Sequence, residues 1–133
     1  MKKSKSLGKG LFLSVILLFA SFTALFILYQ YSRDIAGVYG KHLKSVILYG
    51  SYARGDFNDD SDIDIMILLD ISDAEIKNYR HELSAITYDY NVEYEIDIKP
   101  IAKNEAHFVR WVSAYPFYAN VNQEGVKLYG AES

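Results

Sequence analysis

The chain divides into two stretches with different hydrophobic patterns. No charged residue occurs between positions 10 and 32, and the 19 residues at 11–29 are almost continuously apolar. About 20 apolar residues are enough to cross a bilayer. We therefore expect residues 1–32 to form an appended hydrophobic helix. A membrane anchor through 11–29, a cleaved signal peptide, a buried helix and a wrongly assigned start codon are the alternative interpretations.

The remaining residues, 33–133, show the short alternating elements of an α/β domain. Apolar, β-branched or alternating runs predict strands at 45–50, 61–70 and 94–101. Helical spacing of apolar residues predicts helices at 33–43, at 73–90 and after Asn104. Ser72 and Asn104 are expected to cap two of these helices, and Tyr115–Pro116 is expected to break the last one.

Composition limits this region to one folded domain. The chain has 133 residues, of which 50% are hydrophobic and 23% are charged. A domain of roughly 100 to 150 residues can bury about two thirds of its unfolded surface, which permits one real core. The absence of cysteine excludes disulfides, a thiol nucleophile and thiolate zinc sites.

Charge is distributed unevenly along the chain. All 17 acidic residues but only 10 of the 14 basic residues lie at 33–133, which gives this region a formal charge of −7. An acidic domain disfavours non-specific binding to nucleic-acid phosphates and attracts cations. We therefore expect no nucleic-acid partner.

Two carboxylates interrupt the second predicted strand. Residues two apart on a strand share a face, so Asp62 and Asp64 point to one side while Ile63 and Ile65 point into the core. Neighbouring carboxylates repel each other unless a cation lies between them. Carboxylates, water and phosphate oxygens are ligands that suit Mg²⁺. The pair therefore predicts a divalent metal site.

A third carboxylate is expected from the strand at 94–101. By the same period of two, one face there carries Glu93, Glu95, Asp97 and Lys99. If this strand lies beside the second one, Asp97 or Glu95 completes a cluster of three carboxylates. Such a cluster can hold two metal ions and stabilise both the attacking and the leaving oxygen of a phosphoryl displacement.

The connection between the first two strands contains a candidate phosphate site. Gly50 allows the backbone to approach a phosphate closely, and Ser51 is expected to open a helix whose N–H groups favour anions. Arg54 can pair with a phosphate or with an acidic partner through its planar guanidinium. The acidic residues between 56 and 60 are interpreted as a solvated loop.

The order Gly50-Ser51 and then Asp62-x-Asp64 resembles the signature of the DNA polymerase β-like nucleotidyltransferases. The string GSYARGDFNDDSDIDIMILLD at 50–70 is similar to the minimal nucleotidyltransferase subgroup, as is NQEGVKLY from residue 122. The resemblance extends over about residues 33–130. It implies a polymerase β-like fold, which is a small mixed β-sheet flanked by helices. The hydrophobic N-terminal segment is appended to this fold.

The resemblance also implies an activity. Such proteins transfer a nucleoside monophosphate from an NTP in the presence of Mg²⁺, and the expected nucleotide here is ATP. The expected catalytic and metal-binding residues are Asp62, Asp64 and Asp97, and the expected nucleotide-binding residues are Gly50, Ser51 and Arg54. Many members of the subgroup pair with a HEPN-domain toxin and act as antitoxins by transferring AMP to it.

The N-terminal segment is foreign to this subgroup, whose members are cytoplasmic. The lysines that precede residues 11–29 would place the domain outside the cell, whereas the chemistry requires ATP and therefore the cytoplasm. We expect a cytoplasmic domain, and a membrane anchor through 11–29 stays possible. Whether the protein forms a homo-oligomer stays open as well.

The expected acceptor is a hydroxyl on a protein, because about 100 residues leave no second domain for a deep acceptor pocket. One alternative is a HEPN-binding antitoxin module without catalysis. The other is a small-molecule nucleotidyltransferase of the aminoglycoside type that is completed by dimerisation.

Overall fold

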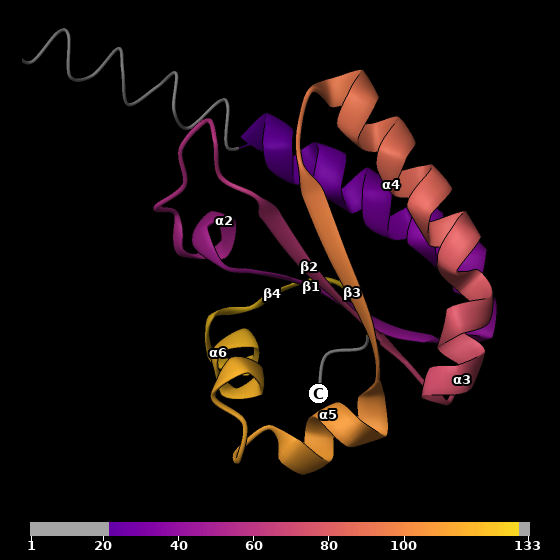
Figure 1. Cartoon of the computed structure of the whole chain (residues 1–133). Coiled ribbons are helices and arrows are strands. Elements are labelled where there is room, and N and C mark those ends of the chain that lie inside the picture. Colours follow the sequence, from indigo (N-terminus) through magenta and orange to yellow (C-terminus); the bar gives the residue numbers. More distant parts are fainter. Residues whose placement is uncertain (1–21, 131–133) are drawn as a thin grey trace, which may run out of the picture. The chain divides into compact units, whose positions relative to one another are not determined.

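A computed structural model describes residues 22–130 of the chain (Figure 1). Of these, residues 22–30 belong to one compact unit and residues 31–130 to a second. Residues 22–39 are helical. Among the described residues, no helix is long and apolar enough to cross a membrane. Most of the apolar stretch at 11–29 lies outside the described residues, so its interpretation stays a prediction.

The second unit is built on one mixed sheet with the order β3-β2-β1-β4. Its strands are β1 (Leu43–Tyr49), β2 (Ile63–Leu69), β3 (Ile98–Asn104) and β4 (Val126–Gly130). β1 pairs antiparallel with β2 and β4, whereas β2 pairs parallel with β3. The predicted mixed sheet is therefore confirmed, as is the condition that the second and third predicted strands are neighbours.

Helices connect the strands, and two of them, α3 and α5, start directly after the predicted capping residues. The helical elements after residue 39 are η1 (Gly40–His42), α2 (Ser51–Arg54), α3 (Asp73–Ile76), η2 (Lys77–Tyr79), α4 (Arg80–Tyr94), α5 (Glu105–Trp111) and α6 (Pro116–Glu124). Ser72 accepts a hydrogen bond from the Glu75 amide, and Asn104 accepts one from the His107 amide. The predicted single helix at 73–90 is wrong in detail, because the 3-10 turn η2 divides it.

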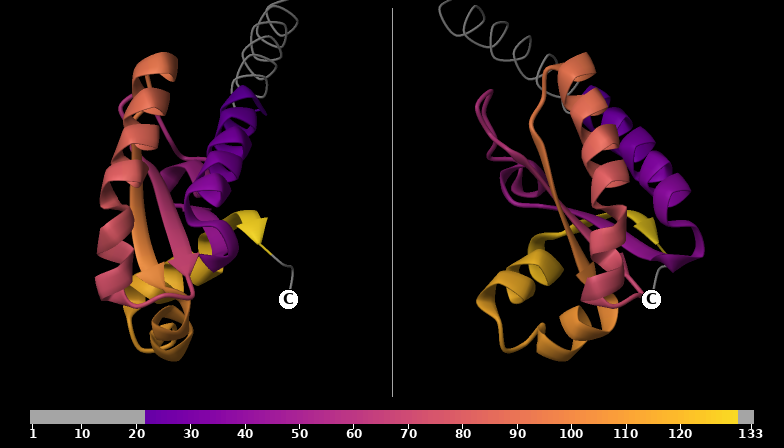
Figure 2. Two further views of the ribbon diagram at one scale, coloured as in Figure 1. Left: turned by 90° about the vertical axis from the view of Figure 1, so that its right-hand side faces the viewer. Right: turned by 45° about the vertical axis from the view of Figure 1, so that its right-hand side comes forward.

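The two faces of the sheet are covered differently. α4 lies along one face (Figure 2), where Ile63, Ile65 and Ile67 of β2 are buried. The helical residues from Tyr31 onward pack there as well, since the buried Tyr31 hydroxyl lies 2.8 Å from Thr87 Oγ1 of α4. On the other face, α5 and α6 cover only the part of β1 and β2 that forms a second core cluster. That cluster consists of Ile47, Tyr49, Met66, Leu68, Phe108, Tyr118 and Val121.

The third strand starts later than the sequence pattern predicts. α4 continues to Tyr94, and Glu95 ends it with a left-handed backbone (φ 53°). Glu93, Glu95 and Asp97 therefore all precede β3, and the prediction that they share a strand face with Lys99 is wrong, although Asp97 lies only one residue before the strand. The physical reason is a contact between a side chain of α4 and the backbone of the first residue of β3. The Asn91 side chain accepts a bond from the Ile98 amide at 2.8 Å and donates one to the Ile98 carbonyl at 3.3 Å.

We expect Asn91→Ala to lower the free energy of unfolding by about 1–3 kcal/mol, because both backbone groups of Ile98 lose their partner. Urea denaturation measures this. Asp89→Ala, on the same helix with an exposed side chain, is the matched control and should change stability by less than about 0.5 kcal/mol. Equal stability of the two variants would contradict this role of Asn91.

Candidate active site

The two predicted strand carboxylates lie at the end of the sheet that α5 and α6 leave open. Asp62 immediately precedes β2, and Asp64 pairs with Tyr49 of β1 and with Lys99 of β3. Because paired residues share a face, Asp64, Tyr49 and Lys99 point to the same side of the sheet. This is the face on which Met66 is covered, so the carboxylates lie beside the core cluster and not within it.

Lys99 connects Asp62 with Asp97. Its Nζ lies 3.1 Å from Asp62 Oδ2 and 3.8 Å from Asp97 Oδ2. The hydrogen bond from this ammonium lowers the pKa of Asp62, and the same bond raises the pKa of Lys99. The parallel β2–β3 pairing causes the juxtaposition, since the Ile63 amide donates to the Asp97 carbonyl at 2.8 Å. The sequence placed Lys99 on this face but gave it no role.

Asp64 is in a different electrostatic environment from Asp62. Burial, followed by the charge of Asp62, raises the pKa of Asp64. The same carboxylate contributes, after burial, to raising the pKa of Tyr49 to about 12. Asp62 and Asp64 therefore differ in proton affinity although they are only two residues apart. Such pairs of unequal carboxylates are typical of sites that bind a cation or perform acid–base chemistry.

Gly50 provides the space that the Asp64 carboxylate occupies. A Cβ atom at position 50 would collide with Asp64 Oδ2. The backbone of Gly50 (φ 75°, ψ −155°) belongs to a region that is essentially restricted to glycine. α2 begins at the next residue, as predicted for Ser51, and the Gly50 carbonyl accepts the amides of Ala53 and Arg54 at 3.1 Å.

Glu124 anchors the turn between β1 and α2. Its side chain accepts a hydrogen bond from the Gly50 amide at 3.1 Å. It also forms an ion pair with Arg54, in which Nη1 lies 3.2 Å from Glu124 Oε2. Arg54 also binds Asp56 at 3.2 Å, so it meets acidic partners, one of the two roles expected for it. Sequence reasoning included Glu124 only within the segment NQEGVKLY and gave it no role, because its contact with Gly50 joins residues 74 apart in the chain.

The donor chemistry of Asp62 and Asp64 fits a magnesium ion, because hard carboxylate oxygens on one strand face are what that ion binds. The space left by Gly50 lets the Asp64 carboxylate reach this position. Within residues 22–130, however, no three His, Asp or Glu side chains are arranged to hold a metal ion. The cluster of three carboxylates with Asp97 stays a prediction.

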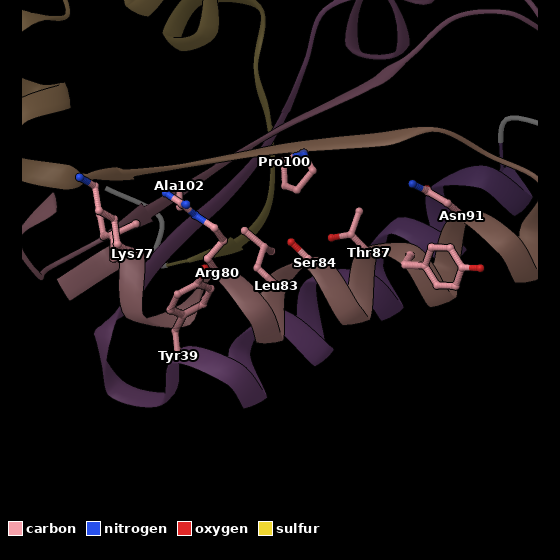
Figure 3. A pocket seen from close by; sticks show the side chains of 11 residues that line it. Tyr39, Lys77, Arg80, Leu83, Ser84, Thr87, Asn91, Pro100 and Ala102 are labelled. Atoms are coloured by element: carbon pink, nitrogen blue, oxygen red, sulfur yellow. The ribbon is translucent and has the colours of Figure 1, made fainter. Parts of the chain in front are cut away.

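A cavity of about 540 Å³ lies on the face of the sheet opposite to the carboxylates. Figure 3 shows Pro100 and Ala102 of β3 facing Leu83, Ser84 and Thr87 of α4 across this cavity. Its lining contains no carboxylate, and β2 and β3 separate it from Asp62 and Asp64. It is therefore not part of the candidate active site.

Comparison with known proteins identifies the family. The family model described as "Nucleotidyltransferase domain" matches residues 33–118. The chain belongs to this family. The nucleotidyltransferase is similar to two proteins of Methanocaldococcus jannaschii that are both named "Putative protein adenylyltransferase". One is 35% identical over 75 residues, which are 56% of this chain and 74% of that protein. The other is 34% identical over 100 residues, which are 75% of this chain and 92% of that protein.

Solved structures show the same fold. The crystal structure of a "putative nucleotidyltransferase" from Sulfolobus solfataricus aligns with a TM-score of 0.60 at 20% identity, covering 86% of each chain. A mutant of the toxin–antitoxin complex MntA–HpeT aligns with a TM-score of 0.51 at 18% identity, covering 78% of this chain and 74% of that one. The predicted nucleotidyltransferase fold is thereby confirmed.

We expect Gly50→Ala to weaken nucleotide binding strongly, because the new Cβ displaces the Asp64 carboxylate. The unfavourable backbone conformation adds a loss of stability of about 1–3 kcal/mol. Gly55→Ala is the matched control. Gly55 also has a positive φ (83°), but nothing lies within 4 Å of its Cβ position. It should lose about 1–2 kcal/mol and retain its affinity for ATP, measured by calorimetry. Equal ATP affinities in the two variants would contradict the role assigned to Gly50.

Proposed function

We propose that this nucleotidyltransferase transfers AMP from ATP, with Mg²⁺, to a hydroxyl group on a protein partner. The observation that carries the proposal is the placement of the Asp64 carboxylate in the space beside Gly50, next to Asp62 and the Lys99–Asp97 pair. The names of the two relatives as protein adenylyltransferases support the choice of nucleotide and acceptor. In this proposal the domain acts in the cytoplasm, where ATP is available.

The proposed reaction forms one phosphorus–oxygen bond and breaks another. The acceptor hydroxyl oxygen attacks the α-phosphorus of ATP, the bond to the β-phosphate oxygen breaks, and pyrophosphate leaves. The hydroxyl proton passes to a nearby carboxylate or to water. The products are a phosphodiester between AMP and the partner, pyrophosphate and one proton, so the reaction requires no further reagent.

The proposed roles follow the arrangement of the site. Gly50 and Ser51 bind the triphosphate with backbone and hydroxyl groups, and Arg54 orients the turn through Glu124 and becomes a phosphate ligand when the nucleotide is present. Asp62 and Asp64 would hold magnesium, with Asp97 on the acceptor side. When bound, it neutralises phosphate charge and lowers the pKa of the attacking hydroxyl.

A HEPN-domain toxin is the proposed partner, and the protein is its antitoxin. The resemblance of residues 50–70 to the minimal nucleotidyltransferases supports this choice. One solved structure with the same fold is described as the toxin–antitoxin MntA–HpeT, which supports a toxin–antitoxin role. A small helical HEPN protein encoded by an adjacent gene is the first acceptor to test, by incubation with labelled ATP and Mg²⁺.

Two other functions are less well supported. A purely binding antitoxin would gain nothing from Asp64, whose raised pKa reports an ionised form that is disfavoured in the fold. An aminoglycoside-type enzyme would have to enclose its acceptor beside Asp62 and Asp97, whose side chains are 42% and 58% exposed. Label transfer to an aminoglycoside in place of the HEPN protein would support that alternative.

We expect Asp64→Asn to abolish transfer of label from ATP to the partner, because the neutral amide cannot hold the metal. The unfolding free energy at pH 7 should stay equal or rise. The folded-state pKa of Asp64 is raised, so its charge opposes folding at neutral pH, and this opposition disappears as the pH falls below the pKa of the unfolded state. The gain from the substitution should therefore shrink in acid.

Asp60→Asn is the control for this prediction, because Asp60 is an exposed acid in the loop before β2. It should leave both transfer and stability unchanged. Full transfer activity in Asp64→Asn would remove Asp64 from the catalytic machinery.

A further inference from the structure

An aromatic cavity lies on the same sheet face as the carboxylates. Its volume is about 460 Å³, within the range of roughly 300 to 1,000 Å³ typical of small-molecule sites. It is formed by one side of β3 and the start of α6, and its lining residues are Ile101, Lys103, Tyr115, Pro116, Phe117 and Tyr118. We call it the α6 cavity. Neither the carboxylates nor the Gly50 turn contributes to it.

The strand register places the α6 cavity next to the carboxylates. Lys99, Ile101 and Lys103 alternate along β3 and therefore share one face. Lys99 pairs with Asp64 in the sheet and binds Asp62. At roughly 3.3 Å per residue, Ile101 follows Lys99 after about 7 Å. The cavity thus begins at Ile101, the next residue after Lys99 on this face of β3.

A second route through the aromatic side chains joins the two places. Tyr49 pairs with Asp64 in the sheet, and its ring meets the Phe117 ring edge to face, with centroids 5.6 Å apart. Phe117 lines the α6 cavity and is 44% exposed. Along this face, the turn at Gly50 is therefore followed by the Asp64 carboxylate, then by the Tyr49 ring and then by the α6 cavity.

The cavity presents aromatic surface that the core does not use. Tyr115 is also 44% exposed, and its ring stacks on Trp111 at 5.3 Å with an interplanar angle of 9°, which fixes its orientation. Tyr118, in contrast, is buried in the core cluster and forms the floor. A flat ring suits this mostly aromatic lining, in which Lys103 is the single charged residue. Lys103 offers a donor to an acceptor atom on the edge of such a ring.

We infer that the α6 cavity binds the base of the nucleotide, and that Phe117 is the residue on which a purine stacks. The inference rests on the proposed function. With the triphosphate at Gly50 and Ser51 and the base against Phe117, the α-phosphate lies between them, beside Asp62 and Asp64. Stacking on an aromatic side chain depends on ring area, so a purine binds more tightly than a pyrimidine.

The test compares ATP with inorganic triphosphate, which has no base, in calorimetric titrations of the full chain with Mg²⁺. We expect Phe117→Ala to weaken ATP binding about tenfold and to leave triphosphate binding unchanged, whereas Phe117→Trp retains ATP affinity. Wild-type protein should bind ATP and GTP more tightly than CTP and UTP. The matched control is Tyr88→Ala, an exposed aromatic residue of α4 that lines the cavity on the opposite face. It should change neither affinity.

Three results would overturn the inference. Unchanged ATP affinity in Phe117→Ala would show that the base binds elsewhere. If this variant binds ATP normally but no longer transfers AMP, Phe117 is a contact for the partner and the inference is still overturned. An equal loss of ATP and triphosphate affinity would show that Phe117 acts through the phosphate turn. If wild-type protein binds no nucleotide at all, the proposed function itself fails, and this outcome is distinct from the other two.

Discussion

The candidate site depends on the repulsion between Asp64 of β2 and Asp62, which immediately precedes that strand. Ile63 and Ile65, which alternate with Asp62 and Asp64, are buried on one face and therefore keep both carboxylates on the other. The fold compensates for this repulsion unequally. The Lys99 ammonium stabilises the charge of Asp62, whereas the ionised form of Asp64 remains disfavoured. A cation that binds both carboxylates would relieve the remaining repulsion, which is why the arrangement is suited to magnesium and a polyphosphate.

The partial cover of the sheet converts this charge pair into an oriented site. α5 and α6 pack on one end of the face and leave the carboxylate end open, so the core supports the site without burying it. α6 then contributes at both of its ends, because Glu124 at its last residue holds the Gly50 turn, and Phe117 near its start borders the aromatic cavity. In our account the triphosphate and the base of one nucleotide occupy these two places.

Local patterns were sufficient to predict the features that neighbouring residues determine. The alternation around Asp62 and Asp64, the caps Ser72 and Asn104, and the helix start after Gly50 are all encoded within a few residues. Features that depend on distant contacts were missed. Glu124 lies far along the chain from the turn that it anchors. The alternation at 94–101 also does not indicate that β3 starts only at Ile98, where the Asn91 side chain binds the backbone. β4 was missed because it is a short edge strand in which only Leu128 is buried.

The most direct measurement is mass spectrometry of the partner protein after incubation with this nucleotidyltransferase, ATP and Mg²⁺, with peptide mapping of the modified residue. Our account predicts that the partner gains AMP on a serine, threonine or tyrosine hydroxyl and that pyrophosphate appears in equal amount. A partner that forms a stable complex with the protein but remains unmodified, with ATP intact, would contradict the account and identify the protein as a binding module.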